Sequence, residues 1–228
     1  MTISLDVGEW ALVLAAIAAL LDWVAVIGQW KRLEYLCKPA TMIALIVAAV
    51  SLTSGRSDVV FRVAFLLGLS FSLVGDVALM LPGERTFLIG LVAFLLGHLG
   101  YIAGFNVTLP PLTAPVFLPV IGLLDAVILN RLVGGLKARG DDELQVPVIV
   151  YGIVLSLTLA SGWSTLFRPA WSISARIVAI VGGTFFFASD LMLAWNRFMH
   201  RSRLLHVLVI ITYHLAQFAL TFTLILAP

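Results

Sequence analysis

Eight long apolar segments divide the chain, and they constrain its fold more than any other feature. They lie near residues 8–28, 39–54, 60–81, 87–105, 114–136, 145–163, 173–195 and 204–226. A membrane-spanning helix needs about 20 predominantly apolar residues, because the hydrocarbon core is about 30 Å thick. With 61% hydrophobic and 11% charged residues, the chain carries more apolar surface than a soluble domain hides. The sequence therefore predicts an all-α, polytopic membrane protein with eight transmembrane helices.

The connections between these segments are short, which predicts a single transmembrane domain over residues 1–228. The two longest connections cover residues 106–113 and 136–144, and neither leaves room for a soluble domain. The segment 39–54 is short for a span unless its helix extends back over Leu36, Cys37 and Lys38. The first lysine is Lys31, so the basic region of a cleaved signal peptide is missing. We expect the first segment to remain as a spanning helix.

Lysine and arginine residues are unevenly divided between the two sides of the predicted helices. Ten of them lie on the side of the 1–2, 3–4, 5–6 and 7–8 connections, and four lie on the other side. Cytoplasmic loops carry the excess of positive charge, so both termini are expected outside the cytoplasm, in the inner membrane if the source is bacterial. The net charge of +2 comes from these loop residues and indicates no nucleic-acid partner.

Four landmarks recur in the same order in both halves of the chain. The pairs are Asp22 and Asp125, Pro39 and Pro147, Asp76 and Asp190, and His98 and His214. A shift by four helices preserves helix direction, so the pattern predicts two parallel four-helix repeats, residues 1–105 and 106–228. Chance recurrence in an apolar sequence is the alternative.

Asp76 and Asp190 are the strongest candidates for chemistry. Each follows a small residue inside an apolar segment, in Gly75-Asp76 and Ser189-Asp190. A carboxylate within a membrane helix costs about 2.5–3.5 kcal/mol on insertion scales, so it usually faces a protein interior or a wet cavity. We predict that the two share a site near the cytoplasmic ends of their helices. A packing role is the alternative, and it is the reading we prefer for Asp22 and Asp125.

Polar residues on two further segments are candidates for substrate contacts. His98 and Tyr101 are three residues apart and share one helix face. Tyr213, His214 and Gln217 lie together on the last segment. The alternative is that each forms a hydrogen bond to a neighbouring helix. Glycines at 90, 97 and 104 repeat every seven residues and predict a seam of close helix contact.

The order of these motifs resembles that of the YhhN-like family from the second predicted helix to the eighth. The matching motifs are Lys38-Pro39, Gly75-Asp76-x-x-Leu79-Met80, Phe87-x-x-Gly90-x-x-Ala93-Phe94-x-x-x-His98-x-x-Tyr101, Pro147-x-x-x-Tyr151, Ser189-Asp190-x-x-Leu193-Ala194-x-Asn196-Arg197-Phe198 and Tyr213-x-x-Ala216-Gln217. Animal members of this family are lysoplasmalogenases, which cleave the vinyl-ether bond of lysoplasmalogens to a fatty aldehyde and a glycerophospho-alcohol. The resemblance implies a hydrolase whose partners are a lysophospholipid and the bilayer.

Vinyl-ether hydrolysis suits a pair of buried carboxyl groups. It begins with proton transfer to the β-carbon, and the resulting oxocarbenium ion then takes up water. One carboxylic acid supplies the proton, and an ionised partner stabilises the cation and accepts a proton from water. We therefore expect Asp76 and Asp190 to be catalytic, with no metal or cofactor, although the sequence leaves open which is the acid. Residues expected to contact substrate or water are Tyr35, Lys38, His98, Tyr101, Tyr151, Asn196, Arg197, Tyr213, His214 and Gln217.

Two other functions fit the same residues. Intramembrane Asp and His residues also serve proton-coupled transporters, which are often built from repeats. A metal-dependent lipid hydrolase would use Asp76, Asp190, His98 and His214 as zinc ligands. The single cysteine, Cys37, excludes an intramolecular disulfide and a cysteine-based zinc site.

Overall fold

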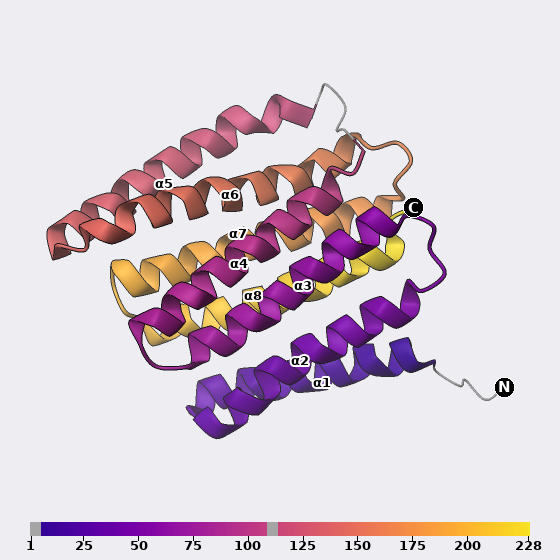
Figure 1. Cartoon of the computed structure of the whole chain (residues 1–228), viewed down its shortest axis with the longest axis horizontal. Helices are drawn as coiled ribbons and strands as arrows, with labels where there is room; N and C mark the ends of the chain where they lie inside the picture. Colours follow the sequence, from indigo (N-terminus) through magenta and orange to yellow (C-terminus); the bar gives the residue numbers. More distant parts are fainter. Residues whose placement is uncertain (1–5, 109–113) are drawn as a thin grey trace.

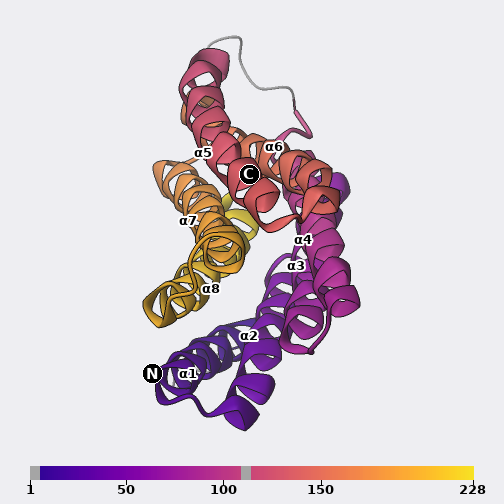
Figure 2. The same ribbon diagram turned by 90° about the vertical axis from the view of Figure 1, so that its left-hand side faces the viewer.

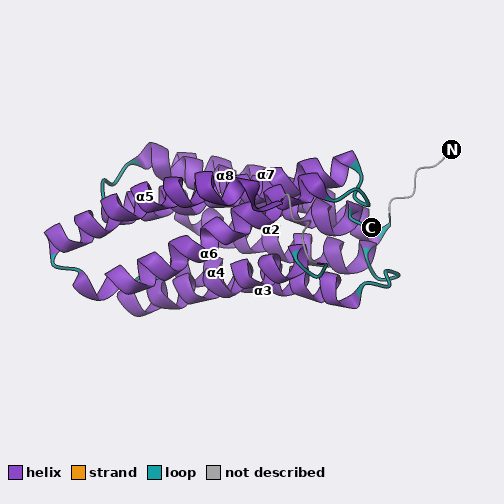
Figure 3. Cartoon of the chain, turned by 90° about the horizontal axis from the view of Figure 1, so that it is seen from above, coloured by secondary structure: helices purple, strands orange, loops and turns teal. Residues whose placement is uncertain are grey.

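The chain folds into a bundle of long helices. A computed structural model describes residues 6–108 and 114–228, and within them it has eight long helices and no strand (Figures 1 and 3). The helices are α1 Val7–Gly28, α2 Lys31–Leu52, α3 Val59–Met80, α4 Glu84–Phe105, α5 Leu118–Arg139, α6 Gln145–Ser164, α7 Ile173–Phe198 and α8 Arg203–Leu226; the short 3-10 helices are η1 Ala114–Phe117, η2 Asp142–Leu144 and η3 Thr165–Phe167. All eight long helices have the length and apolar character of a membrane span, which confirms the predicted fold class.

Helix α2 begins well before the apolar segment that revealed it. The sequence indicated residues 39–54, whereas the helix covers Lys31–Leu52 and has Pro39 in its interior. Proline lacks the N–H that would bond the carbonyl four residues earlier, yet the helix continues because neighbouring helices support it. Its polar first two turns include Glu34 and Lys38, both of which are buried. The extension brings these two charged side chains into the bundle.

Helix pairs that are adjacent in sequence form the structural units of the bundle. Helices α1 and α2, α3 and α4, and α7 and α8 pack along their lengths. Figure 2 shows α1 and α2 at one edge, α5 and α6 at the opposite edge, and the other four helices between them. Helix α2 joins its edge to α3 and α8, and α6 joins the other edge to α7 and α4. The four central helices therefore contain the most enclosed part of the molecule.

The predicted glycine seam is the contact surface between α4 and α3. A Cβ atom at Gly104 would lie 2.5 Å from the Phe65 ring, and one at Gly90 would lie 2.6 Å from Leu79. On α3, a Cβ at Gly68 would lie 2.5 Å from the Tyr101 ring. These separations are below van der Waals contact, so glycine is what allows the two backbones to approach. Small residues drive helix association in lipid, where burial of apolar surface provides no force between helices.

An aromatic cluster fills the space among the central helices. Phe186 of α7 is fully buried, and its ring centre lies 4.2 Å from that of His98. The rings of Tyr101 and Tyr213 each lie 5.9 Å from the Phe186 ring, and the ring of Phe94 lies 6.3 Å away. Aromatic pairs at these separations add about 0.5–1.5 kcal/mol each beyond their buried area. The cluster holds α4, α7 and α8 in register around the candidate site.

Both described ends of the chain lie at the same end of the bundle, as an even number of spans requires (Figure 1). Which side of the membrane this end faces stays a prediction from the charge distribution. The repeat also stays a prediction, which superposition of residues 1–105 on 106–228 would test. Helix α2 packs against α1, α3 and α8, and helix α6 packs against α5, α7 and α4, which correspond to them under a shift of four helices.

Candidate active site

Two cavities meet at the end of the bundle where α2 begins and where α3 and α7 end. The polar cavity, about 150 Å³, lies among α2, α3, α7 and α8 and is lined by the charged residues Lys31, Glu34, Lys38, Asp76 and Asp190 together with His206. The apolar cavity, about 60 Å³, lies among α4, α5, α6 and α7. Four residues line both cavities: Leu79, Phe94, Asp190 and Leu193. Asp190 is the only carboxylate in this shared wall among the described residues.

Asp76 is held in an ion pair at the closed end of the polar cavity. Its side chain is fully buried, and Lys38 Nζ lies 2.9 Å from Oδ1. The hydroxyl of Tyr213 donates a hydrogen bond of 2.6 Å to Oδ2. The Lys38 ammonium also lies 5.4 Å from the centre of the Tyr213 ring, within cation–π range. An ammonium at contact distance stabilises the carboxylate form of its partner, so Lys38 opposes the effect of burial on Asp76.

Asp190 has different partners. Its Oδ2 lies 3.0 Å from His98 Nε2 and accepts a hydrogen bond from the Tyr151 hydroxyl. Its Oδ1 has no hydrogen-bond partner in the part of the chain that the structure describes, and the carboxyl group is slightly exposed to the cavities. Both supporting contacts therefore converge on one oxygen, and the other oxygen remains available to a bound molecule. No ammonium or guanidinium group is paired with this carboxyl group within residues 6–108 and 114–228.

Thr158 orients the His98 ring. His98 Nδ1 lies 3.1 Å from Thr158 Oγ1, and the threonine hydroxyl donates to the carbonyl of Val154. Because the hydroxyl proton is directed to that carbonyl, Thr158 Oγ1 accepts from Nδ1–H. A neutral His98 with its proton on Nδ1 presents the Nε2 lone pair to Asp190, and a protonated Asp190 can donate to it. The arrangement suits a carboxylic acid whose proton is held in place until it is transferred.

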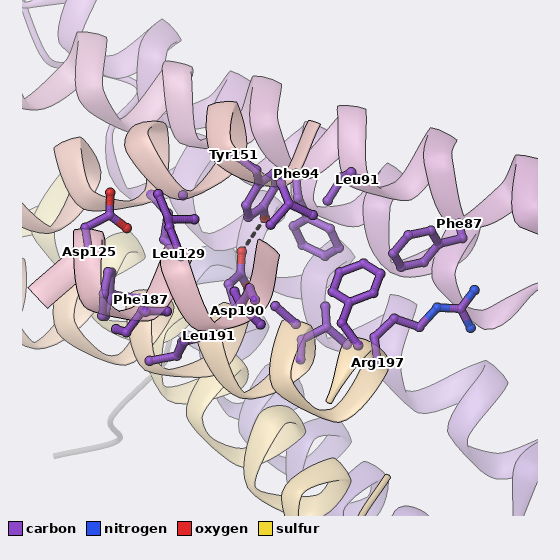
Figure 4. Close-up of a pocket in the computed structure, with 18 of the residues that line it drawn as sticks. Phe87, Leu91, Phe94, Asp125, Leu129, Tyr151, Phe187, Asp190, Leu191 and Arg197 are labelled. Carbon is purple, nitrogen blue, oxygen red and sulfur yellow. Dashed lines mark hydrogen bonds between the residues drawn. The ribbon is translucent and has the colours of Figure 1, made fainter. Parts of the chain in front are cut away.

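The apolar cavity extends along the helix axes on either side of Asp190. Figure 4 shows Arg197 and Phe87 at one end, Asp125 at the other, and Asp190 with Tyr151 between them. Its remaining walls are mainly leucine and phenylalanine side chains. A hydrocarbon chain is the ligand that such a lining suits.

The structure divides the other predicted substrate contacts into two groups. Lys38, Tyr151 and Tyr213 contact the two carboxyl groups, and His98 contacts Asp190. In contrast, the Tyr101 hydroxyl donates a 2.6 Å hydrogen bond to Gln217 Oε1, and both residues are fully buried away from the two cavities. This pair joins α4 to α8.

His214 faces away from both cavities. Its Nδ1 accepts a 3.0 Å hydrogen bond from Trp23 Nε1, and its Nε2 lies 3.9 Å from Asp22 Oδ2. The four proposed zinc ligands therefore do not converge, because His214 contacts α1. Within the described residues, no three Asp, Glu, His or Cys side chains are grouped in a way that suits a metal ion.

Tyr35, Asn196 and Arg197 lie at the same end of the bundle as the polar cavity. The Tyr35 hydroxyl donates to the Met80 carbonyl at 2.8 Å and forms part of the rim of this cavity. Asn196 Oδ1 accepts from the Ser202 amide at 2.6 Å and shapes the turn between α7 and α8. The Arg197 guanidinium lies 4.6 Å from the centre of the Phe87 ring, at the mouth of the apolar cavity.

Sequence reasoning missed Glu34, Thr158 and His206. Glu34 lies one helical turn before Lys38, and this spacing would have placed both on one face had the start of α2 been known. Thr158 is one of several hydroxyl residues in α6, and nothing in the sequence distinguishes it from the others.

Taken together, the fold and the site define a polytopic helical membrane protein with a buried carboxylate site between a polar and an apolar cavity. The sequence model of the YhhN family matches residues 33–224, and the chain belongs to this family. The match runs from the first turn of α2 to the last turn of α8 and includes every residue that lines the two cavities except Lys31.

Three curated relatives of the chain carry the same name. The chain is 28% identical over 211 residues to mouse lysoplasmalogenase TMEM86B, and the match covers 91% of this chain and 82% of the relative. It is 30% identical over 203 residues to the pig protein, covering 88% and 78%. The match to the human protein is 28% over 160 residues and spans 69% of this chain but only 61% of the length of that relative. No solved structure matches the chain.

Proposed function

We propose that the protein is a lysoplasmalogenase-type hydrolase that cleaves the vinyl-ether bond of a lysophospholipid. The observation that carries the proposal is the position of Asp190 in the wall shared by the polar and apolar cavities. A single-chain lipid has its vinyl-ether bond at the junction of head group and tail. A bound lipid with its head group in one cavity and its tail in the other places that bond at Asp190. The names of the relatives support the same reaction class.

The polar cavity accommodates the glycerophosphate. Lys38 is the most buried cation of this cavity and meets the phosphate. The tail occupies the apolar cavity, which at about 60 Å³ is narrow and must widen as the chain enters. Helix α5 is the wall best able to move, because only Asp125, Leu132 and Leu136 of its residues are buried.

The reaction proceeds in three steps with two carboxyl groups. Asp190 donates its proton to the β-carbon, which converts the C=C–O group into an oxocarbenium ion. Water adds to the carbon bonded to oxygen while the Asp76 carboxylate takes its proton. The hemiacetal then collapses: the Asp190 carboxylate accepts the hydroxyl proton, Asp76 protonates the glycerol oxygen, and the C–O bond to glycerol breaks. One water is consumed, and both carboxyl groups return to their starting states.

The different partners of the two carboxyl groups support different roles. Asp190 contacts His98 and Tyr151 and is paired with no ammonium or guanidinium group in the described residues, so it can hold a proton and serves as the acid. Asp76 is supported by Lys38 and Tyr213 and serves as the ionised partner. When the substrate phosphate draws Lys38 away, Asp76 Oδ1 becomes available to water and faces the developing cation.

The test is hydrolysis of a lysoplasmalogen by pure protein in detergent, run in D₂O. Fatty aldehyde should form, with one deuterium on the carbon next to the carbonyl, because solvent supplies that proton. The matched control substrate is the saturated 1-O-alkyl lysolipid, which lacks the double bond and should not react. Folded wild-type protein that releases no aldehyde would exclude the proposed reaction and favour a proton-coupled transporter.

A further inference from the structure

Glu34 is a buried carboxylate that the proposed reaction does not use. Only 5% of the residue is exposed, although it lies in the first turn of α2 near the end of the bundle. It lines the polar cavity together with Lys38, Asp76 and Asp190. A buried carboxylate needs a cationic or hydrogen-bonding partner, because the desolvation of an unpaired charge is costly.

The partner of Glu34 is a side chain that can leave easily. Lys31 Nζ lies 2.7 Å from Glu34 Oε2, and the Lys31 side chain is 63% exposed. His206 Nε2 lies 3.9 Å from the other oxygen, Oε1, beyond hydrogen-bond distance. An exposed lysine regains full hydration when it swings outward, so its release costs little when a second cation takes its place on Glu34. Glu34 can therefore exchange the Lys31 ammonium for another cation in the cavity.

The spacing of Glu34 and Lys38 matches a zwitterion. The two residues are four apart in α2, so they share one face and are separated by about 6 Å along the helix axis. Glu34 lies closer to the start of the helix, and hence to the mouth of the cavity, than Lys38. A head group whose phosphate meets Lys38 therefore directs its outer end toward Glu34. A two-carbon linker between phosphate and ammonium can bridge one helical turn.

We propose that Glu34 selects lysophospholipids whose head group ends in a primary amine, as in phosphoethanolamine. The ammonium replaces Lys31 on Glu34 and donates N–H hydrogen bonds to the carboxylate. A trimethylammonium group keeps the charge but has no N–H to donate, so it binds less well. An anionic or uncharged head group, such as phosphoglycerol, offers Glu34 no cation. This selectivity rests on the proposed function for its biological meaning, but it can be measured as binding alone.

The experiment compares the binding of three saturated 1-O-alkyl lysolipids, which are not hydrolysed, to the full chain in detergent. Their head groups are phosphoethanolamine, phosphocholine and phosphoglycerol. Wild-type affinity should fall in that order. In Glu34→Gln the preference for ethanolamine over glycerol should shrink about tenfold or more, because a charged hydrogen bond is lost. Glu84→Gln is the matched control: Glu84 is also in the first turn of its helix, at the same end of the bundle, but is exposed.

Lys31→Ala separates ligand selection from a structural ion pair. If Lys31 competes with the substrate ammonium, its removal should leave the ethanolamine preference intact or increase it. If the pair only holds the helix start, Lys31→Ala and Glu34→Gln should weaken all three lipids alike, and that result would overturn the proposal. An absence of head-group preference in the wild type would overturn it as well. Preserved selectivity without aldehyde release would count against the proposed reaction alone.

Discussion

The Lys38–Asp76 ion pair leads to a prediction that separates stability from catalysis. In Asp76→Asn, Lys38 remains 7% exposed and loses the carboxylate at 2.9 Å. Removing one partner of a buried pair costs about 3–5 kcal/mol, because the other charge stays buried without compensation. Asp190→Asn leaves no such charge without a partner, since Asp190 contacts a histidine and a tyrosine hydroxyl. The ion pair therefore predicts a loss of stability for Asp76→Asn and not for Asp190→Asn.

The double variant Lys38→Met with Asp76→Asn completes a double-mutant cycle on the ion pair. It removes both charges and keeps their approximate volumes, so it should recover most of the stability that Asp76→Asn loses. Thermal and denaturant unfolding in one detergent measure this, and aldehyde release measures rate. Both Asp76→Asn and Asp190→Asn should reduce the rate about 10²–10⁴-fold, and the double variant should stay inactive. An Asp76→Asn protein as stable as wild type, with no gain from Lys38→Met, would refute the ion-pair reasoning.

Three further predictions follow from individual contacts. Thr158→Val removes the hydroxyl at 3.1 Å from His98 Nδ1. It should slow aldehyde release about tenfold without changing substrate affinity, because one hydrogen bond is worth about 1–1.5 kcal/mol. An unchanged rate would show that His98 needs no orienting group. Gly152→Leu adds a side chain to the wall of the apolar cavity and displaces the end of Leu129, which a Cβ at this position would approach to 2.7 Å. It should lower kcat/KM for long tails more than for short ones, and an equal loss for all lengths would contradict the placement of the tail. Arg168→Leu removes hydrogen bonds of 2.6 and 2.8 Å to the carbonyls of Phe105, the last residue of α4, and of Thr108, which follows it. The variant should lower the free energy of unfolding by about 2–3 kcal/mol while the rate per folded molecule stays normal, so a stable but inactive variant would refute this role.

The number and type of the helices could be predicted because the bilayer imposes a length on every apolar segment. The glycine seam of α4 was also readable, since small residues at a constant spacing have few other uses in a membrane helix. The start of α2 was not readable, because hydropathy does not detect helical turns that carry charges. Its first two turns contain Glu34 and Lys38, so the wall that α2 contributes to the polar cavity could not be read from hydropathy.

The side chains that contact the two carboxyl groups were the second feature that the sequence could not predict. The sequence suggested Asp76 and Asp190 as equivalent members of a pair, but their surroundings come from different helices: Lys38 of α2 and Tyr213 of α8 for one, His98 of α4 and Tyr151 of α6 for the other. Periodicity reports which face a residue occupies and not which helix packs against that face. The asymmetry between the two carboxyl groups is therefore a property of tertiary packing.

Asp22 gives the last prediction, because its surroundings differ from those of the other buried carboxylates. It is fully buried in α1, and neither of its oxygens has a hydrogen-bond partner in the described residues. Trp23 donates to His214 Nδ1, so the proton of a neutral His214 lies on Nε2, facing Asp22 Oδ2 at 3.9 Å. Asn at this position retains an acceptor for that proton and removes an unpaired acidic group, and Asp22 also precedes the stretch that matches the family. Asp22→Asn should therefore keep the rate of aldehyde release within about threefold and unfold at the same temperature or higher. A loss of a hundredfold or more in a well-folded Asp22→Asn protein would place Asp22 in the proton chemistry and would require a mechanism with three carboxyl groups.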